Sequence, residues 1–137
     1  MNLEHSELKK RFGKNIIFQE NLSKYSWFNL GGPAKILFKP ESIEELVNFL
    51  KYVNNSLKIT CIGAGSNTLF RDGGFSGVVI KLSSKFSYIN MIEENILEVG
   101  AGTFDKTLSR YAAENSIANF EFLSCIPGSI GGTIKMN

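Results

Sequence analysis

The chain has 137 residues, 43% of them hydrophobic and 20% charged, and its formal net charge is +2. This composition is typical of one folded domain and excludes a disordered chain. No Lys/Arg cluster exists beyond Lys9-Lys10-Arg11, so nucleic-acid binding is not expected. No apolar run is long enough to cross a membrane, so neither a membrane span nor a secretory signal is expected, and the expected location is the cytoplasm.

The first 24 residues form a polar lead-in segment with a weak helical pattern. Residues 29–33, Asn-Leu-Gly-Gly-Pro, predict a turn, and residues 34–38 predict a strand. Ser42 and Glu45 have the spacing of a capping box, so a helix should begin at this point. Asn54-Asn55 should end that helix. Its apolar positions recur at helical spacing and predict one buried stripe, which consists of Ile43, Leu46, Val47, Leu50 and Val53.

Residues 58–62 predict a strand buried on both faces, which completes a strand–helix–strand unit. After a turn at 71–74, strands are expected at 78–82, 87–92 and 96–99. A second helix should follow, capped by Thr103 and ending at Asn115-Ser116. One face of that helix should carry Phe104, Leu108, Tyr111 and Ala112.

The residues that support hydrolytic and metal chemistry are scarce. His5 is the single histidine, and Cys61 and Cys125 have no CxxC partner. A zinc site is therefore not expected, and catalysis by a Ser-His-Asp or Cys-His set is not expected either. We interpret the cysteines as reduced, buried, small hydrophobic residues. Trp27 and Phe28 could stack on an aromatic cofactor, but burial in the core is the preferred interpretation.

The first glycine-rich candidate site is Gly63-Ala64-Gly65-Ser66-Asn67, called the 63–67 loop below. It follows a predicted strand, and α/β sheets bind ligands at the carboxyl ends of their strands. Thr68 occupies the third glycine position of a dinucleotide fingerprint, and no lysine follows as in a phosphate loop. The backbone amides still suit a pyrophosphate, and an ordinary loop remains the alternative.

The second candidate is Ile126-Pro127-Gly128-Ser129-Ile130-Gly131-Gly132, called the 126–132 loop below. Its glycines, proline and serine lie among apolar residues, which indicates a tight loop in apolar surroundings. A hairpin connection would not need so many glycines, so ligand contact is the preferred hypothesis. The segment at 100–103 is weaker and is interpreted as a strand-to-helix turn.

These two loops occur in one order with three further motifs: Phe28-Asn29-Leu30-Gly31-Gly32-Pro33-Ala34, Asp72-Gly73-Gly74-Phe75-Ser76-Gly77-Val78-Val79-Ile80 and Met136-Asn137. From about Tyr25 onward the series resembles the UDP-N-acetylenolpyruvoylglucosamine reductases, also called UDP-N-acetylmuramate dehydrogenases. The resemblance implies an α+β fold, a FAD-binding domain of the vanillyl-alcohol-oxidase (PCMH) type. A small α/β lobe and the start of a larger, mostly antiparallel lobe would occupy residues 25–137, truncated at the C-terminal end.

The resemblance also implies non-covalent FAD, with its pyrophosphate on the 63–67 loop. The 126–132 loop would then lie along the pyrophosphate, the ribityl chain and the flavin. Family enzymes take hydride from NADPH and reduce UDP-N-acetylglucosamine enolpyruvate to UDP-N-acetylmuramate for peptidoglycan synthesis. Their catalytic serine, arginine and glutamate are expected beyond Asn137, so no catalytic residue is assigned and the chain alone should be inactive.

The sequence departs from the family pattern at Ser124-Cys125, where small residues are usual, and at Thr133, which replaces a common alanine. Two other functions remain open. The first is a truncated, non-catalytic remnant of a flavin fold. The second is a related flavin-dependent sugar oxidase, which fits the 126–132 loop less well and often tethers FAD through a histidine, for which His5 is badly placed.

Overall fold

The computed structural model describes residues 5–54 and 56–136. The chain folds into two compact units, Met1–Leu82 and Ser83–Asn137, and each is described by itself. Asn55 and Asn137, which belong to the predicted helix stop and to the last motif, lie outside the described residues. No helix in the described ranges is long and apolar enough to span a membrane.

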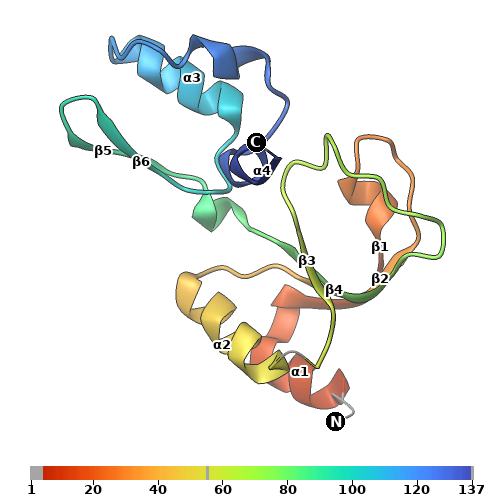
Figure 1. The fold of residues 1–137 in the computed structure, drawn as a ribbon. Helices are drawn as coiled ribbons and strands as arrows, with labels where there is room; N and C mark the ends of the chain where they lie inside the picture. The colour runs from red at the N-terminus through yellow and green to blue at the C-terminus, as the bar shows by residue number, and fades with distance from the viewer. Residues whose placement is uncertain (1–4, 55, 137) are drawn as a thin grey trace. The chain divides into compact units, whose positions relative to one another are not determined.

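The first unit is built on one mixed sheet with the strand order β1-β2-β4-β3 (Figure 1). The strands are β1 (Ile16–Asn21), β2 (Pro33–Phe38), β3 (Ile59–Ile62) and β4 (Phe75–Lys81). β2, β4 and β3 run parallel, and β1 is antiparallel to β2. The predicted strand–helix–strand unit is present, but β4, which comes later in the chain, lies between its two strands.

Two helices, α1 (His5–Phe12) and α2 (Ile43–Val53), pack on the sheet (Figure 1). The predicted start of α2 is confirmed, because the Ser42 hydroxyl accepts a hydrogen bond from the Glu45 amide at 3.1 Å. The Glu45 carboxylate in turn accepts a hydrogen bond from the Glu41 amide at 2.8 Å. A cap of this kind stabilises a helix by about 1 kcal/mol.

The predicted buried stripe of α2 is largely wrong. Phe49 and Val53 are fully buried, whereas Ile43, Val47 and Leu50 are exposed. The helix carries apolar side chains on two faces, and the face with Phe49 packs against the sheet. Asn54 ends the helix as predicted, in a left-handed conformation with φ of 37°.

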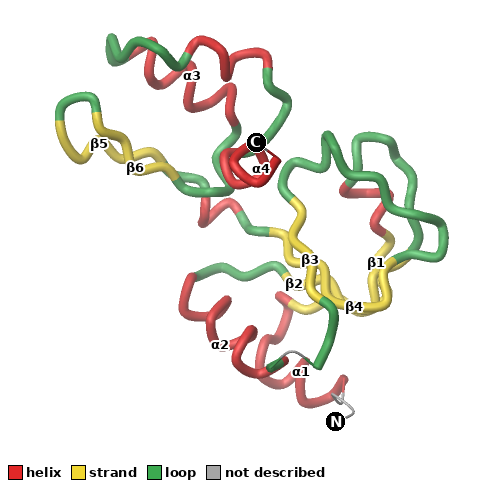
Figure 2. The backbone as a smooth tube through the Cα atoms, in the orientation of Figure 1, coloured by secondary structure: helices red, strands yellow, loops and turns green. Residues whose placement is uncertain are grey.

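The two faces of the sheet carry different layers. α1 and α2 cover one face, and the core there contains Leu8, Phe12, Ile16, Ile36, Phe38, Phe49, Val53, Val78 and Ile80. Residues 22–32 and 63–74, which we call the loop layer, lie on the other side of the sheet from these helices (Figure 2). The core on that side contains Leu22, Ala34, Leu37, Ile62 and Val79. The candidate 63–67 loop therefore belongs to a layer of loops above a buried sheet.

Glycines let the segments of the loop layer cross at short distance. The Gly32 amide donates to the Arg71 carbonyl at 2.9 Å, and a Cβ on Gly32 would lie 1.9 Å from the Asp72 carbonyl oxygen. A Cβ on Gly74 would lie 2.0 Å from the Pro33 oxygen. Close packing of the backbone therefore explains why Gly32 and Gly74 are glycines.

β3 is an edge strand, because within the described residues it pairs only with β4. The prediction that it is buried on both faces is therefore wrong, and Cys61 is exposed. Partial burial still raises the pKa of the Cys61 thiol above its ordinary value, which favours the protonated form. Cys125 is also exposed, because it ends a surface 3-10 helix, so the expectation of two buried cysteines is wrong.

Residues 5–24 supply part of the core of the first unit. α1 contributes Leu8 and Phe12, and β1 contributes Ile16, and all three are buried. The boundary between a lead-in segment and a domain at residue 25 stays a prediction.

Glu20 joins β1 to the loop layer. Its carboxylate accepts hydrogen bonds from the Tyr25 hydroxyl at 2.9 Å and from the Lys24 ammonium at 3.3 Å. The Tyr25 hydrogen bond is the main cause that holds the pKa of Glu20 below its ordinary value, followed by Lys24 and the charge of Lys39, while burial opposes the shift.

We expect Glu20→Gln to reduce the acid sensitivity of the fold. With a lowered pKa, Glu20 stabilises the folded state above its ordinary pKa, and this contribution is lost as the pH falls through the lowered value. Urea unfolding at about pH 7 and about pH 3 measures the difference. As a control, Glu94→Gln changes an exposed turn residue. The drop in the free energy of unfolding between the two pH values should then equal that of the wild type. An equal acid loss in the wild type and in Glu20→Gln would contradict the assignment.

The second unit contains a two-stranded antiparallel sheet, β5 (Ile89–Glu93) and β6 (Ile96–Val99), drawn in Figure 2 as a hairpin. Its helices are α3 (Asp105–Glu114) and α4 (Ile130–Met136). Short 3-10 helices complete the two units: η1 (Gly13–Asn15), η2 (Leu22–Tyr25), η3 (Ser84–Phe86) and η4 (Glu121–Cys125).

The predicted start of α3 is off by one residue. Phe104 is the N-cap and makes no side-chain cap, whereas Thr103 is buried and donates its hydroxyl to the Tyr88 carbonyl at 3.1 Å. Of the residues predicted for the packed face, Leu108 and Ala112 are buried. Phe104 belongs to the same predicted face, but its side chain is 56% exposed. Asn115 ends the helix as predicted.

Candidate functional site

The 63–67 loop leaves the carboxyl end of β3, where the sequence places it. In the described part of the chain, the amides of Ala64, Gly65, Ser66 and Asn67 donate to no protein acceptor. Gly65 has a φ of +78°, in the left-handed region. Consecutive free amides around a left-handed residue form a concave anion-binding nest. This donor set therefore fits a diphosphate.

Gly65 lies against the segment that follows η2. The Trp27 amide donates to the Gly65 carbonyl at 3.0 Å, and a Cβ on Gly65 would lie only 1.9 Å from the Tyr25 carbonyl oxygen. The Ser26 hydroxyl donates to the Thr68 carbonyl at 2.8 Å. The loop is therefore held on both sides of its nest while its amides stay free.

Lys81, at the end of β4, is a functional candidate that the sequence analysis missed. Its ammonium donates to the Gly63 carbonyl at 2.8 Å. Burial, and secondarily the charge of Lys39, lowers the pKa of Lys81 below its ordinary value. A cation fixed at the start of the 63–67 loop favours an anionic ligand there. The available sequence signal was a lysine directly after the apolar run 78–80.

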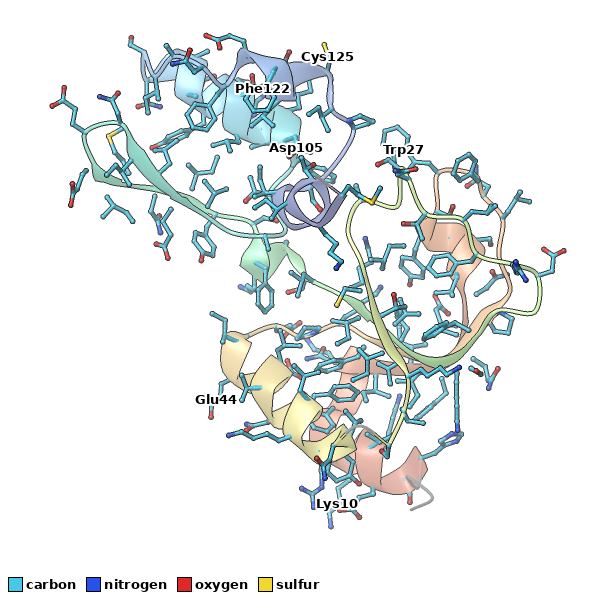
Figure 3. All side chains as sticks on the ribbon, in the orientation of Figure 1. Lys10, Trp27, Glu44, Asp105, Phe122 and Cys125 are labelled. Carbon is cyan, nitrogen blue, oxygen red and sulfur yellow. The ribbon has the colours of Figure 1, made fainter. Side chains whose placement is uncertain are left out.

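Trp27 and Phe28 are not core residues, and the preferred interpretation from sequence is wrong. Their side chains are 60% and 54% exposed. The buried position in this segment is occupied by Ser26, whose side chain is hydrogen-bonded to the Thr68 carbonyl. Figure 3 shows Trp27 at the end of the first unit opposite to Lys10 and Glu44, which belong to α1 and α2.

The second candidate segment is only half loop. Residues 126–129 are irregular, but Ile130, Gly131 and Gly132 form the first turn of α4. The amides of Gly128 and Ser129 have no protein acceptor among the described residues, so they are candidate donors. The expectation of a continuous loop is corrected, because Thr133 donates its amide to the Ser129 carbonyl and closes a helical turn.

The start of α4 packs tightly against the segment before α3. The amides of Ile130 and Gly131 donate to the carbonyls of Thr103 and Ala101, both at 2.9 Å. A Cβ on Gly131 would lie 3.0 Å from the Ala101 Cβ. Gly131 therefore allows a close approach of α4 to Ala101 within this unit, whatever its role toward a ligand.

Asp105, the first residue of α3, is labelled in Figure 3; it is fully buried, and its amide donates to the Gly128 carbonyl at 3.2 Å. Its Oδ2 accepts a hydrogen bond from the Thr133 hydroxyl at 2.6 Å. Its Oδ1 is buried without a partner among the described atoms. A Cβ on Gly128 would lie 2.5 Å from Oδ2, so the glycine makes room for this pair. Nothing in the sequence signals the hydrogen bond between Thr133 and Asp105, which are 28 positions apart.

Other chemistry-bearing residues are dispersed in the described structure. No group of three or more His, Cys, Asp or Glu side chains converges on a possible metal site in these ranges. The His5 ring stacks on Phe18 with a centroid distance of 4.1 Å. Glu121, Arg71 and Asp72 are exposed. The backbone donors of the two loops are therefore the features that point to a ligand.

In the first unit, the parallel strands and the loop layer define an α+β fold of the kind that binds nucleotides at the carboxyl ends of its strands. Residues 34–137 match the family model described as FAD binding domain, and the chain belongs to this family. The resemblance stated from the motifs and the predicted PCMH-type fold class are both confirmed. FAD is the cofactor that this family implies.

Individual relatives support the same assignment. The chain is 44% identical over 134 residues to the UDP-N-acetylenolpyruvoylglucosamine reductase of Pelagibacter ubique, covering 98% of this chain and 44% of the relative. It is 47% identical over 117 residues to the enzyme of that name in Rickettsia canadensis, covering 85% and 39%. The crystal structure of the reductase from Thermus caldophilus matches with a TM-score of 0.70 and 32% identity, over 89% of this chain and 41% of that one. The chain thus spans less than half the length of these relatives.

Proposed function

We propose that this chain is the FAD-binding part of an NADPH-dependent reductase that converts UDP-N-acetylglucosamine enolpyruvate to UDP-N-acetylmuramate. The observation that carries the proposal is the row of four free amides in the 63–67 loop, within a chain whose relatives bear the name of this reductase. When bound, FAD would accept hydride from NADPH and deliver it to the enolpyruvyl group. The proposal places the enzyme in the cytoplasm, where NADPH and nucleotide sugars occur.

Each part of the site has a role in this proposal. Ala64, Gly65, Ser66 and Asn67 bind the pyrophosphate through their amides, and Lys81 holds the loop through the Gly63 carbonyl. The segment with Ile126, Pro127, Gly128, Ser129, Gly131 and Gly132 binds FAD further along its length, with the amides of Gly128 and Ser129 as donors. No catalytic residue is assigned in this chain.

A hybrid enzyme tests the proposal. This chain would replace the matching part of the Pelagibacter ubique relative, and the purified hybrid would be assayed for bound flavin and for NADPH oxidation that depends on UDP-N-acetylglucosamine enolpyruvate. We expect both flavin and substrate-dependent oxidation. A folded hybrid that retains flavin but ignores the substrate would favour a related oxidase. A folded hybrid without flavin would favour the non-catalytic remnant.

The chain alone gives the complementary result. It should retain flavin absorbance after mixing with FAD and desalting, but it should show no substrate-dependent NADPH oxidation. Robust turnover by the 137-residue chain would overturn the assignment of catalysis to residues outside it.

A further inference from the structure

Trp27 is unusually exposed for its residue type, because tryptophan side chains are highly buried on average. Its side chain is 60% exposed, and Phe28 and Leu30 in the same segment are each 54% exposed. Apolar side chains gathered on one surface segment often mark a place that binds a ligand or another molecule.

The backbone that carries Trp27 is firmly held, so the exposure is a fixed feature of the fold. The Trp27 amide donates to Gly65, and the buried Ser26 donates its hydroxyl to Thr68. The Ser26 hydroxyl oxygen also accepts a hydrogen bond from the Phe28 amide at 3.3 Å. The Asn29 amide closes the turn onto the Ser26 carbonyl at 3.0 Å. The indole thus projects from an ordered turn.

The same hydrogen bonds place Trp27 next to the anion-binding nest. The Trp27 amide is 3.0 Å from the carbonyl oxygen of Gly65, and Gly65 is itself one of the residues with a free amide. A dinucleotide whose pyrophosphate binds these amides carries a planar ring one sugar or one ribityl chain away. Such a ring can reach the side chain beside the nest, and indole stacks well on planar heteroaromatic rings.

From this placement we propose that Trp27 forms a stacking wall for one of the two planar rings of FAD, adenine or isoalloxazine. The inference rests on the proposed function, because it requires FAD on the 63–67 loop. It adds to the proposed site a residue, Trp27, that contacts a ring of the cofactor, whereas the amides of the 63–67 loop contact its phosphates.

The sole tryptophan of the chain makes the proposal directly measurable, because its fluorescence reports on Trp27 alone. The purified chain would be titrated with ADP, FMN and FAD while its emission is recorded. ADP does not absorb where indole emits, so a change caused by ADP requires a change around the ring. We expect ADP to quench the emission if adenine is the stacked ring. If isoalloxazine is stacked, we expect FMN to bind and ADP to leave the emission unchanged.

Paired variants separate stacking from general packing. Trp27→Leu should weaken FAD binding roughly 5- to 150-fold, the equivalent of ~1–3 kcal/mol for one stacked ring. Trp27→Phe should restore most of this loss, because phenylalanine keeps a flat aromatic face. Flavin retention and flavin fluorescence measure the affinities, and circular dichroism checks the fold of each variant. A role limited to filling space would not distinguish phenylalanine from leucine.

The possible failures have different meanings. If the wild type retains FAD and a folded Trp27→Leu binds it with unchanged affinity, stacking is overturned and the proposed function stands. Equal losses in Trp27→Leu and Trp27→Phe also overturn it. If Trp27→Leu does not fold, the fluorescence of the wild type decides, and no response to ADP or FMN overturns the proposal. Failure of the folded wild type to retain FAD overturns both this inference and the proposed function.

Discussion

Gly65→Val is expected to abolish FAD retention by the chain and to lower its free energy of unfolding. Gly65 has a φ of +78°, and a Cβ would lie 1.9 Å from the Tyr25 carbonyl oxygen. A β-branched residue in the left-handed region costs about 1–3 kcal/mol before any clash is counted. The loop must therefore move away from Tyr25, which separates the amides that form the nest. Flavin absorbance after desalting and urea unfolding measure the two effects.

Gly73 provides the matched control in the same loop layer. A Cβ on Gly73 meets no atom within 4 Å, so Gly73→Ala should leave both FAD retention and stability close to the wild type. Wild-type FAD affinity in a folded Gly65→Val would remove the 63–67 loop from the proposed site. Loss of affinity in Gly73→Ala as well would show that the layer does not tolerate substitution in general.

The local features of the fold could be predicted from the sequence because they are determined by neighbouring residues. The capping pair Ser42 and Glu45 starts α2 as expected, and the two hydrogen bonds of the cap join residues three and four positions apart. The turn at 71–74 is also local and is closed by a hydrogen bond from the Gly74 amide to the Arg71 carbonyl at 2.9 Å. The placement of the 63–67 loop followed from the strand before it. Each of these predictions needed a short segment only.

Features that depend on distant segments could not be predicted. The periodicity of α2 is compatible with burial of either Ile43 or Phe49, and only the sheet decides between these faces. β4 inserts between β2 and β3, so β3 becomes an edge strand and Cys61 becomes exposed. Trp27 points outward because Ser26 donates a hydrogen bond to Thr68, which is 42 positions away. The role of Lys81 likewise depends on a distant residue, because its ammonium donates to the carbonyl of Gly63, 18 positions away.

Thr133→Ala is expected to destabilise the second unit, although alanine is the residue that the resemblance gives as common there. The Thr133 hydroxyl is the donor for Asp105 Oδ2 at 2.6 Å, and Oδ1 already has no partner among the described atoms. The substitution leaves a fully buried carboxyl group with neither oxygen hydrogen-bonded within the described structure. An unsatisfied buried group of this kind costs about 1–3 kcal/mol. Urea unfolding measures the loss.

Thr107→Ala is the matched control, because it removes the same groups from an exposed position of α3 and should change stability by less than about 0.5 kcal/mol. A double-mutant cycle with Asp105→Ala then isolates the pair. Thr133→Ala should cost much less when Asp105 is already alanine, because no buried carboxyl remains to be satisfied. Strictly additive losses would show that the hydrogen bond contributes nothing. Since this pair joins the start of α3 to the first turn of α4, FAD affinity should fall with stability in Thr133→Ala.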